Sequence, residues 1–365
     1  MKAGIRSIGW WVPEARLDAQ EIAQAYGLPA GAVAGAGLHS RAVAGPDDHP
    51  STMAARATRH ALGAAGLALD DLDLLIFAGV TRDWPNPWVA AFGVLHELGA
   101  PGCAGFDIAN RCAAGIDALW IAKALVESGT HKTVAVCCAD RFDHYLGPQD
   151  RPARTPFDTM YSAGAATAIV SAEADNTMAG YAHYTNPRLA VHCATGPWSG
   201  GSRAPLDRRG LEAGHHLWQV RMSVRDLDDI SRYEVEADRH NYPSIMKQAG
   251  VDGFDLVACS PLDPGPQLKA LQDLGIDPAA TLFTVPRLGH IGPADLFLIL
   301  GIAVASGRAV GNRVAMSMRT SAYANALALI GAGSDPGIRV AGQGVDLRLW
   351  QAAPSPERLA EEHTP

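Results

Sequence analysis

The feature that most constrains the fold is a pair of matched motifs in the two halves of the 365-residue chain. In "DIANRCAAGID", Asp117 follows Cys112 by five residues, and in "PRLGHIGPAD", Asp295 follows His290 by the same interval. His290 lies 178 residues after Cys112, and the same offset separates the two aspartates. Self-similarity at a fixed offset is typical of repeated structural units. The sequence therefore predicts two similar halves.

The order of the predicted elements supports this duplication. An Ala-rich helical segment at 52–67 precedes a short apolar strand at 71–80, and a helix at 113–128 precedes a strand at 133–139. In the second half, "MKQAGVDGFDLVACS" and "GHIGPADLFLILGIAVASGRAVGNRVAMSM" repeat that order. Alternating helices and strands predict an α/β fold. The predicted units are 1–175 with the cysteine, 176–350 with the histidine, and a polar tail at 351–365.

Composition excludes several classes of protein. The chain is 48% hydrophobic and 19% charged, which is ordinary for a globular protein. Its net charge of −8 argues against nucleic-acid binding, which needs clustered Lys and Arg. A membrane-spanning run of about 18 apolar residues is missing from the sequence, and its first residues do not resemble a signal peptide. We therefore expect a cytoplasmic protein without a membrane segment.

The six cysteines do not indicate disulfides or a metal site. They lack the paired spacing of a disulfide framework and of zinc motifs, and no nucleotide-binding glycine motif is present. Cys137 and Cys138 are adjacent in the predicted strand "TVAVCCA", so they should point to opposite faces and pack as small apolar residues. We expect no metal ion and no permanently bound cofactor.

The predicted duplication would place Cys112 and His290 close together, where they could react as a pair. Each residue precedes a predicted helix, and a pseudo-twofold axis would bring the two helix N-termini together. A cysteine at a helix N-terminus gains thiolate character, because the helix dipole and free N–H groups stabilise negative charge. A histidine delivered from the mirror position can act as its base. The matched placement therefore predicts a Cys–His site.

The segment "FDIANRCAAGIDAL" resembles the nucleophile segment of the thiolase superfamily, and specifically that of ketoacyl synthase III enzymes. In that family a strand ending in Phe-Asp leads to a cysteine followed by Ala and Gly. The resemblance extends in the right order through "GIRSIGWWVPE", "GLHSRAVAG", "PNPWVAAFGVLHELGAPG" and "RVAGQGVDLRLW". It implies a thiolase fold with a duplicated five-layered α-β-α-β-α architecture, and a homodimer formed by strand pairing in the N-terminal half.

The same resemblance implies roles for particular residues. Cys112 would be the acylated nucleophile, and Arg41 would bind substrate near the entrance for pantetheine. The backbone N–H groups of Cys112 and Gln343 would hold the carbonyl oxygen of the acyl group. The acyl group would arrive on CoA or on the phosphopantetheine of an acyl carrier protein.

The chain departs from the condensing members of the family at two positions. Those members use a His in a His-Gln-Ala-Asn segment and an Asn in a Gly-Asn segment to promote decarboxylation and stabilise an enolate. Here the first position is Pro261, with Ser260 beside it, and the second is His290. The segment "MYSAGAATAIV" also departs from the family's Gly-Asp-Gly-Ala-Gly pattern. The pair of enolate-stabilising side chains is therefore absent from the sequence.

A rearranged site of this kind resembles ketoacyl synthase III-like acyltransferases of natural-product pathways, including malonyltransferases of antibiotic biosynthesis. The resemblance implies an acyltransferase that passes an acyl group from CoA or a carrier protein, through a thioester on Cys112, to a hydroxyl or amine of a small secondary metabolite such as a polyketide. No carboxylate would be lost. Two alternatives remain: a carbon–carbon condensing enzyme with an unusual site, and a non-catalytic partner subunit of a synthase.

Several residues have two interpretations at this stage. Asp295 is placed to orient His290 in a triad, but an acidic residue in the first turn of a helix is also favoured by the dipole, and Asp117 occupies the equivalent place. Arg111 either recognises an acyl carboxylate or faces away from the site. Loop or surface positions are expected for His215 and His216. Four tryptophans either line an acceptor cleft or pack in the core or a dimer interface: Trp84, Trp88, Trp198 and Trp218.

Overall fold

The computed structural model describes residues 2–84, 87–142, 159–189, 224–261, 264–308, 310–320 and 322–351. Its strands are β1 (Gly4–Trp11), β2 (Arg16–Asp18), β3 (Ser40–Ala42), β4 (Leu74–Phe77), β5 (Ala104–Asp107), β6 (Thr133–Arg141), β7 (Ala163–Ser171), β8 (Asn176–Thr185), β9 (Leu256–Cys259), β10 (Thr281–Leu282), β11 (Arg313–Arg319), β12 (Tyr323–Gly331) and β13 (Arg339–Gln343). Its helices are α1 (Ala19–Tyr26), α2 (Ala32–Gly35), α3 (Pro50–Ala65), α4 (Ala90–Leu98), α5 (Ala114–Glu127), α8 (Val224–Ala249), α9 (Pro264–Asp273), α10 (Val285–Leu288) and α11 (Ala294–Ala305).

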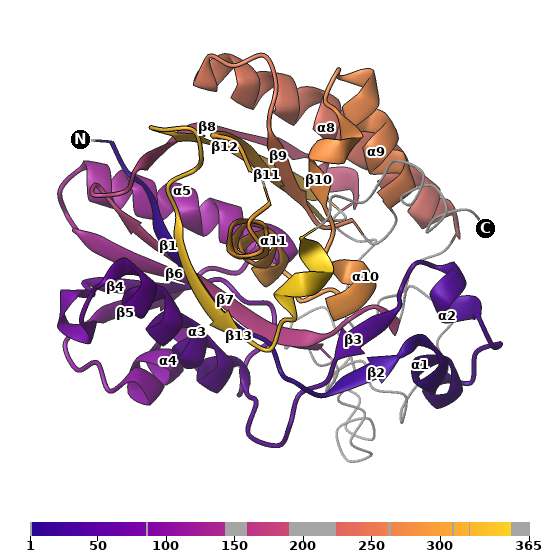
Figure 1. The fold of residues 1–365 in the computed structure, drawn as a ribbon, viewed down its shortest axis with the longest axis horizontal. Coiled ribbons are helices and arrows are strands. Elements are labelled where there is room, and N and C mark those ends of the chain that lie inside the picture. Colours follow the sequence, from indigo (N-terminus) through magenta and orange to yellow (C-terminus); the bar gives the residue numbers. More distant parts are fainter. Residues whose placement is uncertain are drawn as a thin grey trace.

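Two sheets separate three layers of helices (Figure 1). The larger sheet has the strand order β13-β1-β7-β6-β4-β5, and the smaller has the order β10-β9-β11-β12-β8. Helices α3 and α4 pack on the outer face of the larger sheet, and α8 packs on the smaller sheet and on α9. Helices α5 and α11 contact strands of both sheets. The result is the five-layered α/β thiolase architecture that the resemblance implied.

The two sheets have the same topology apart from one strand. In the larger sheet β4 is parallel to β5 and β6, and β7 is antiparallel to β6 and β1. In the smaller sheet β9 is parallel to β10 and β11, and β12 is antiparallel to β11 and β8. The added strand is β13, which pairs with β1 although it comes late in the chain. The matched order supports a duplication; the division at residue 175 stays a prediction.

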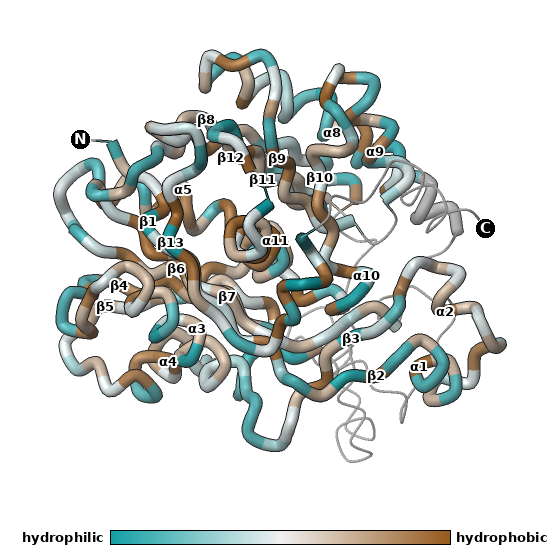
Figure 2. Tube along the Cα trace, in the orientation of Figure 1, coloured by the Kyte–Doolittle hydropathy of each residue, from teal (hydrophilic) through white to brown (hydrophobic). Residues whose placement is uncertain are grey.

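The layer between the sheets is the most apolar part of the molecule. Every residue of α11 from Ala294 to Ala303 is buried, so this helix lacks the polar face of a surface helix. Figure 2 shows α11 as a largely brown coil in the centre, while more teal appears on the outer elements. A helix buried on all sides requires apolar partners on both sheets. This sequence pattern fixes α11, and the histidine loop before it, at the centre of the fold.

Small residues permit the close packing of the outer helix α3 on its sheet. A Cβ at Gly9 of β1 would lie only 2.2 Å from the backbone nitrogen of Ala61 in α3, so a larger residue cannot be accommodated. On the neighbouring strand β6, Cys137 belongs to the apolar cluster beneath α3 and α4, whereas Cys138 belongs to the central cluster. The prediction that these cysteines face opposite sides is confirmed. Within the described ranges, no helix is long and apolar enough to cross a membrane.

Candidate active site

The nucleophile segment forms a sharp turn between β5 and α5. Residues Arg111–Ala113 form a single 3-10 turn before α5 begins at Ala114. Arg111 has a φ of 51°, and it is the one residue other than glycine with a positive φ in the described part of the chain. Such a conformation costs on the order of 1–3 kcal/mol for a residue with a Cβ and is found most often at functional sites. The turn presents Cys112 beside the start of α5.

The histidine loop depends on two glycines between α10 and α11. Gly289 and Gly292, which bracket His290 and Ile291, have φ values of 75° and 64°. A Cβ at Gly289 would lie 2.6 Å from the Cβ of Ser162, and one at Gly292 would lie 2.7 Å from Oδ2 of Asp140. Glycine is therefore needed both for the backbone conformation and for the close approach to the larger sheet.

Cys112 and His290 meet as the duplication predicted. The Sγ atom of Cys112 lies 3.3 Å from Nε2 of His290, and Nδ1 of the same ring lies 2.6 Å from Oδ2 of Asp295. The other carboxylate oxygen of Asp295 accepts the N–H of Ile291 at 2.8 Å. The imidazole is therefore held on one nitrogen and presents the other to the thiol, which is the geometry of a Cys–His–Asp triad.

Ser260 adds a fourth group to this arrangement. Its hydroxyl donates a hydrogen bond to Oδ2 of Asp295 and lies 3.4 Å from Nδ1 of His290. It follows β9, whereas Asp295 belongs to the first turn of α11, so the contact ties the smaller sheet to the central helix. Asp295 is fully buried, and three donors satisfy its carboxylate.

The electrostatics of the site favour a protonated imidazole. Burial acts to lower the pKa of His290, but the carboxylate of Asp295 and the nearby thiol of Cys112 outweigh it and raise this pKa well above its usual value. Protonation of His290 next to Cys112 would stabilise a thiolate by direct charge attraction. The resting site is thus suited to a protonated His290 beside Cys112.

A second buried carboxyl lies on the other side of the histidine loop. One oxygen of Asp140, Oδ1, accepts hydrogen bonds from the N–H groups of Val80 and Thr81 and from the Thr81 hydroxyl. Its other oxygen, Oδ2, has no hydrogen-bond partner in the described structure. Burial raises the pKa of Asp140 to about 7, although these hydrogen bonds and the charge of His290 oppose the shift.

Aromatic rings surround the imidazole of His290. The ring of Phe142 lies parallel to it at a centroid distance of 6.2 Å, and the ring of Tyr161 meets it edge-on at 5.6 Å. Tyr161 also forms an isolated parallel bridge with His290. It belongs to the segment "MYSAGAATAIV", where the sequence departs from the family pattern. Apolar walls of this kind exclude water and strengthen the charge interactions of the triad.

Two other predicted site residues form no hydrogen bond with Cys112, His290 or Asp295 among the described contacts. Arg41 is only 2% exposed, and its Nη1 donates to the carbonyl oxygens of Thr159 and Tyr161. Gln343 ends β13 opposite Trp11 of β1, and its carbonyl oxygen accepts the N–H of Val12 at 3.1 Å. Substrate binding by Arg41 and an oxyanion contact by Gln343 stay predictions.

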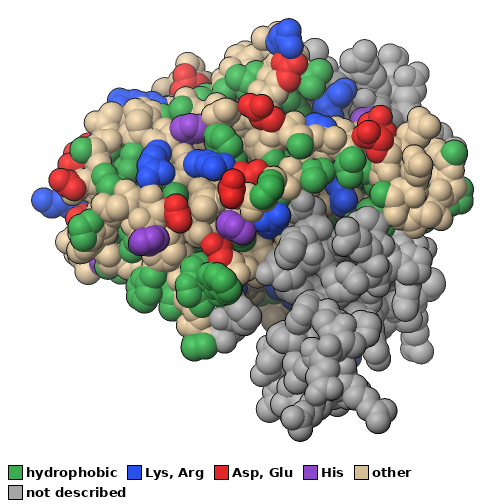
Figure 3. Space-filling model, turned by 90° about the horizontal axis from the view of Figure 1, so that it is seen from below, with side chains coloured by type: hydrophobic (Ala, Val, Ile, Leu, Met, Phe, Trp, Pro, Cys, Tyr) green, Lys and Arg blue, Asp and Glu red, His purple; other side chains and the backbone are tan. Residues whose placement is uncertain are grey.

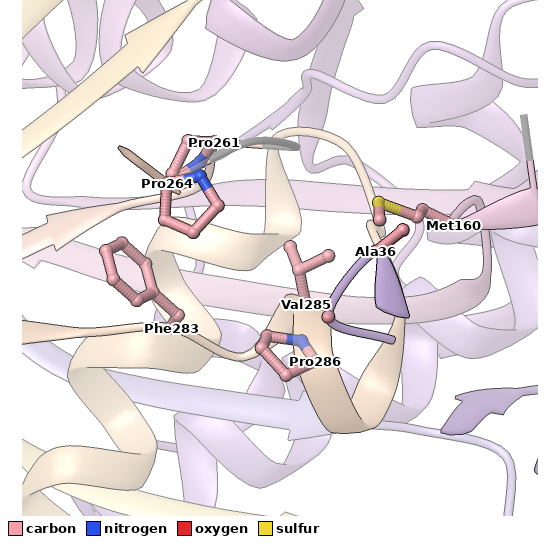
Figure 4. Close-up of a pocket in the computed structure, with 8 residues that line it drawn as sticks. Ala36, Met160, Pro261, Pro264, Phe283, Val285 and Pro286 are labelled. Atoms are coloured by element: carbon pink, nitrogen blue, oxygen red, sulfur yellow. The ribbon is translucent and has the colours of Figure 1, made fainter. Parts of the chain in front are cut away.

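A small apolar pocket lies next to the histidine loop (Figure 4). Pro261, which directly follows Ser260, forms part of its wall, and so does Met160, whose carbonyl oxygen accepts the N–H of His290 at 2.6 Å. Its remaining lining residues are Ala36, Gly37, Pro264, Phe283, Val285 and Pro286. Pro261, where the sequence comparison predicts the catalytic histidine of the condensing members to fall, is thus part of this apolar wall.

Several remaining candidates can be located. Trp84 is 66% exposed, and with Trp88 it lines a surface hollow on α4. An acceptor cleft at these residues stays a prediction. Trp198, Trp218, His215, His216 and the tail after residue 351 lie outside the described residues. Within the described ranges, no group of three or more His, Cys, Asp or Glu side chains could hold a metal ion.

Replacing Asp295 by asparagine should remove the charge that raises the pKa of His290. We expect acyl transfer to fall roughly 10²–10⁴-fold, because the imidazole loses its orienting partner. The raised pKa also stabilises the folded protein below about pH 6.5, and this stabilisation disappears as the pH rises through the folded-state value. The free energy of unfolding in urea should therefore be higher for wild type than for Asp295→Asn. This difference should be larger at pH 6 than at alkaline pH.

Ser260→Ala provides the matched control for Asp295→Asn. It removes one hydrogen bond to the carboxylate but keeps the negative charge beside His290. Its stability should keep the pH dependence of wild type. A stability difference between wild type and Asp295→Asn that does not change with pH would contradict the charge pairing.

Comparisons with known proteins agree with this geometry. Residues 106–187 match the family model of 3-oxoacyl-[acyl-carrier-protein] synthase III. The chain is 29% identical over 316 residues to an acetoacetyl CoA synthase from Streptomyces sp. (strain CL190), with 82% of this chain and 89% of that protein covered. It is 27% identical over 280 residues to a beta-ketoacyl-[acyl-carrier-protein] synthase III from Erythrobacter litoralis, with 74% and 80% covered.

Solved structures show the same fold. The structure of 3-oxoacyl-[acyl-carrier-protein] synthase III from Aquifex aeolicus matches with a TM-score of 0.72 at 21% identity, covering 90% of this chain and 99% of that one. An OleA variant from Xanthomonas campestris matches with a TM-score of 0.75 at 19% identity, covering 90% and 98%. In this chain, the matched segment of the family model includes Cys112 at the start of the central helix α5. Together, the family match, the similar sequences and the shared fold support a ketoacyl synthase III-like enzyme of the thiolase superfamily.

Proposed function

We propose that this enzyme is an acyltransferase that moves an acyl group, through a thioester on Cys112, to a hydroxyl or amine of a secondary metabolite without decarboxylation. The donor would be an acyl-CoA or an acyl carrier protein. The observation that carries the proposal is the chain of contacts from Cys112 to His290 to Asp295, at 3.3 Å and 2.6 Å. Such a chain supplies a nucleophile and an oriented base in one site.

In the loading step, the thiolate of Cys112 attacks the carbonyl carbon of the donor thioester. The tetrahedral intermediate then collapses, and the bond from the acyl carbon to the pantetheine sulfur breaks. The imidazolium of His290 gives its proton to the departing sulfur, which leaves as a thiol. The products are the acyl thioester on Cys112 and a neutral His290.

In the transfer step, neutral His290 accepts the proton of the acceptor hydroxyl or amine as that group attacks the thioester. Asp295 stabilises the imidazolium that forms and keeps Nε2 directed at the reacting atoms. The bond from the acyl carbon to the cysteine sulfur breaks, which releases the ester or amide and restores the imidazolium–thiolate pair. Nε2 of His290 therefore donates a proton in the loading step and accepts one in the transfer step.

The residues around the triad favour transfer over carbon–carbon condensation. Condensation requires stabilisation of an enolate after a carboxylate is lost, and the family uses a His and an Asn for this. Pro261 lacks a side-chain hydrogen-bond donor, and the hydroxyl of Ser260 is bonded to Asp295. Condensation is still the second candidate, because the similar sequences include proteins named as acetoacetyl CoA synthase and beta-ketoacyl synthase III.

The proposal includes a homodimer in the cytoplasm. Strand β5 forms one edge of the larger sheet, and its Phe106 is 37% exposed, so a second copy could pair with this edge. Figure 3 shows hydrophobic side chains exposed on one face among charges of both signs. The proposed location rests on the sequence, in which the cysteines lack the paired spacing of a disulfide framework. A monomer by light scattering at micromolar concentration would contradict the dimer.

The test of the function is a two-stage reaction. The purified protein is first incubated with a series of acyl-CoAs, and intact mass identifies those that load it. Small alcohols and amines, including glycosylated aromatic polyketides, are then added to the isolated acyl-enzyme. We expect loss of the adduct together with formation of an ester or amide. An adduct that none of these acceptors discharges any faster than water would contradict the proposal.

A further inference from the structure

A dense hydrogen-bond cluster surrounds Asp117 in the first turn of α5. Its Oδ1 accepts from the Tyr181 hydroxyl at 2.8 Å, the Tyr323 hydroxyl at 2.9 Å and the Asn325 amide at 2.7 Å. Its Oδ2 accepts from the Asn110 amide at 2.5 Å. Four donors from three other parts of the chain converge on one carboxylate. This is far more than a favourable helix dipole requires.

The cluster holds both ends of the turn that carries Cys112. Asn110, which precedes the turn, bonds to Asp117 directly. Ala113, which ends it, accepts a hydrogen bond at 2.9 Å from the Asn325 amide, and that same amide bonds to Asp117. Only Arg111 and Cys112 lie between these two anchor points. The strained backbone at Arg111 is therefore fixed from both sides.

Three of the four donors come from the smaller sheet, across the predicted boundary between the two halves. Tyr181 belongs to β8, while Tyr323 and Asn325 belong to β12. The Tyr181 ring stacks on Trp120 of α5 at a centroid distance of 5.1 Å, which locks its direction. Burial and the neighbouring Asp117 raise the pKa of Tyr181 to about 12, so its hydroxyl stays a donor at neutral pH.

We propose that Asp117 is a positioning residue for Cys112, which fixes the turn 110–113 so that the thiol stays in contact with His290. The inference rests on the proposed role of Cys112 as nucleophile. It gives the two matched aspartates different tasks. Asp295 holds the side chain of His290, and Asp117 holds the backbone around Cys112. The half of the chain that supplies the histidine thereby also sets the position of the cysteine.

The test measures the reactivity of Cys112 without any acyl donor. Wild type, Asp117→Ala and Asn325→Ala are treated with iodoacetamide over a range of pH, and peptide mass spectrometry reports modification of Cys112 separately from Cys103. Release of the turn separates the thiol from the imidazolium. We expect both variants to be alkylated roughly tenfold more slowly at neutral pH, with the pH profile displaced to higher pH.

Asp238→Ala is the matched control for a loss of stability. It removes a buried carboxylate of α8 that pairs with Arg319 and takes no part in the hydrogen bonds to Asp117 and Ala113. It should lower the melting temperature but keep the alkylation rate and pH profile of wild type. If Asp117→Ala does not fold, Asn325→Ala, which leaves the carboxylate in place, decides the question.

Two outcomes separate this inference from the proposed function. A folded Asp117→Ala or Asn325→Ala variant whose Cys112 reacts with the rate and pH profile of wild type overturns the positioning role alone. A wild-type Cys112 that reacts no faster than Cys103 contradicts the nucleophile itself, and the inference falls with it. Slower alkylation in both variants, with no change in Asp238→Ala, supports it.

Discussion

Replacing Cys112 by alanine is expected to abolish acyl loading and to reduce turnover by a factor on the order of 10⁴–10⁶. The thiol is the group that would form the covalent intermediate, and its contact with His290 at 3.3 Å has no substitute in alanine. Intact mass spectrometry after incubation with acyl-CoA should show an adduct in wild type and none in the variant.

Cys103→Ala controls for non-specific acylation of thiols. Cys103 is also partly exposed, but burial and the nearby Asp73 raise its pKa, so it should react poorly. The Cys103→Ala protein should load as wild type does. An adduct of undiminished yield in Cys112→Ala would place the nucleophile elsewhere in the chain.

Replacing His290 by alanine should affect the two half-reactions differently. Loading should continue more slowly, because the start of α5 still favours a thiolate at Cys112. Deprotonation of the acceptor has no other base in contact with Cys112 among the described residues, so transfer should fall roughly 10²–10⁴-fold. Rapid-quench experiments followed by intact mass should therefore show acyl-Cys112 accumulating before slow product release.

His240→Ala is a suitable control, because His240 is an exposed histidine of the outer helix α8. This variant should load and transfer at wild-type rates. If His290→Ala transfers acyl groups to the true acceptor as fast as wild type, His290 is not the base.

The fold and the centre of the site could be predicted because both depend on repeated local patterns. The offset of 178 residues is enough to pair Cys112 with His290, and helical and strand periodicity defines the layers. The resemblance to a known family then supplies the order of the elements. Contacts between equivalent positions of a duplication follow from its symmetry. They can therefore be predicted without knowing how individual side chains pack.

The remaining contacts depend on long-range packing that no local pattern contains. Ser260 reaches Asp295 only because β9 ends beside α11. In the sequence, the one indication that Ser260 belongs to the site is its position next to Pro261, where a family residue is replaced. Asp117 has the sequence context of a residue that merely complements the helix dipole, since its partners Tyr323 and Asn325 lie more than 200 residues away. Burial of Arg41 against backbone carbonyl groups depends in the same way on how distant segments pack.

The most direct test of the account follows the carboxylate of a malonyl donor. Wild-type enzyme is incubated with malonyl-CoA labelled in its free carboxylate, alone and together with each acyl-CoA that loads Cys112. Carbon dioxide, the protein adduct and the small-molecule products are then collected. The account predicts that any label transferred stays in the adduct and in an ester or amide product, with no release above the uncatalysed rate. Enzyme-dependent release of labelled carbon dioxide, together with a new carbon–carbon bond in the product, would contradict it and establish a condensing enzyme.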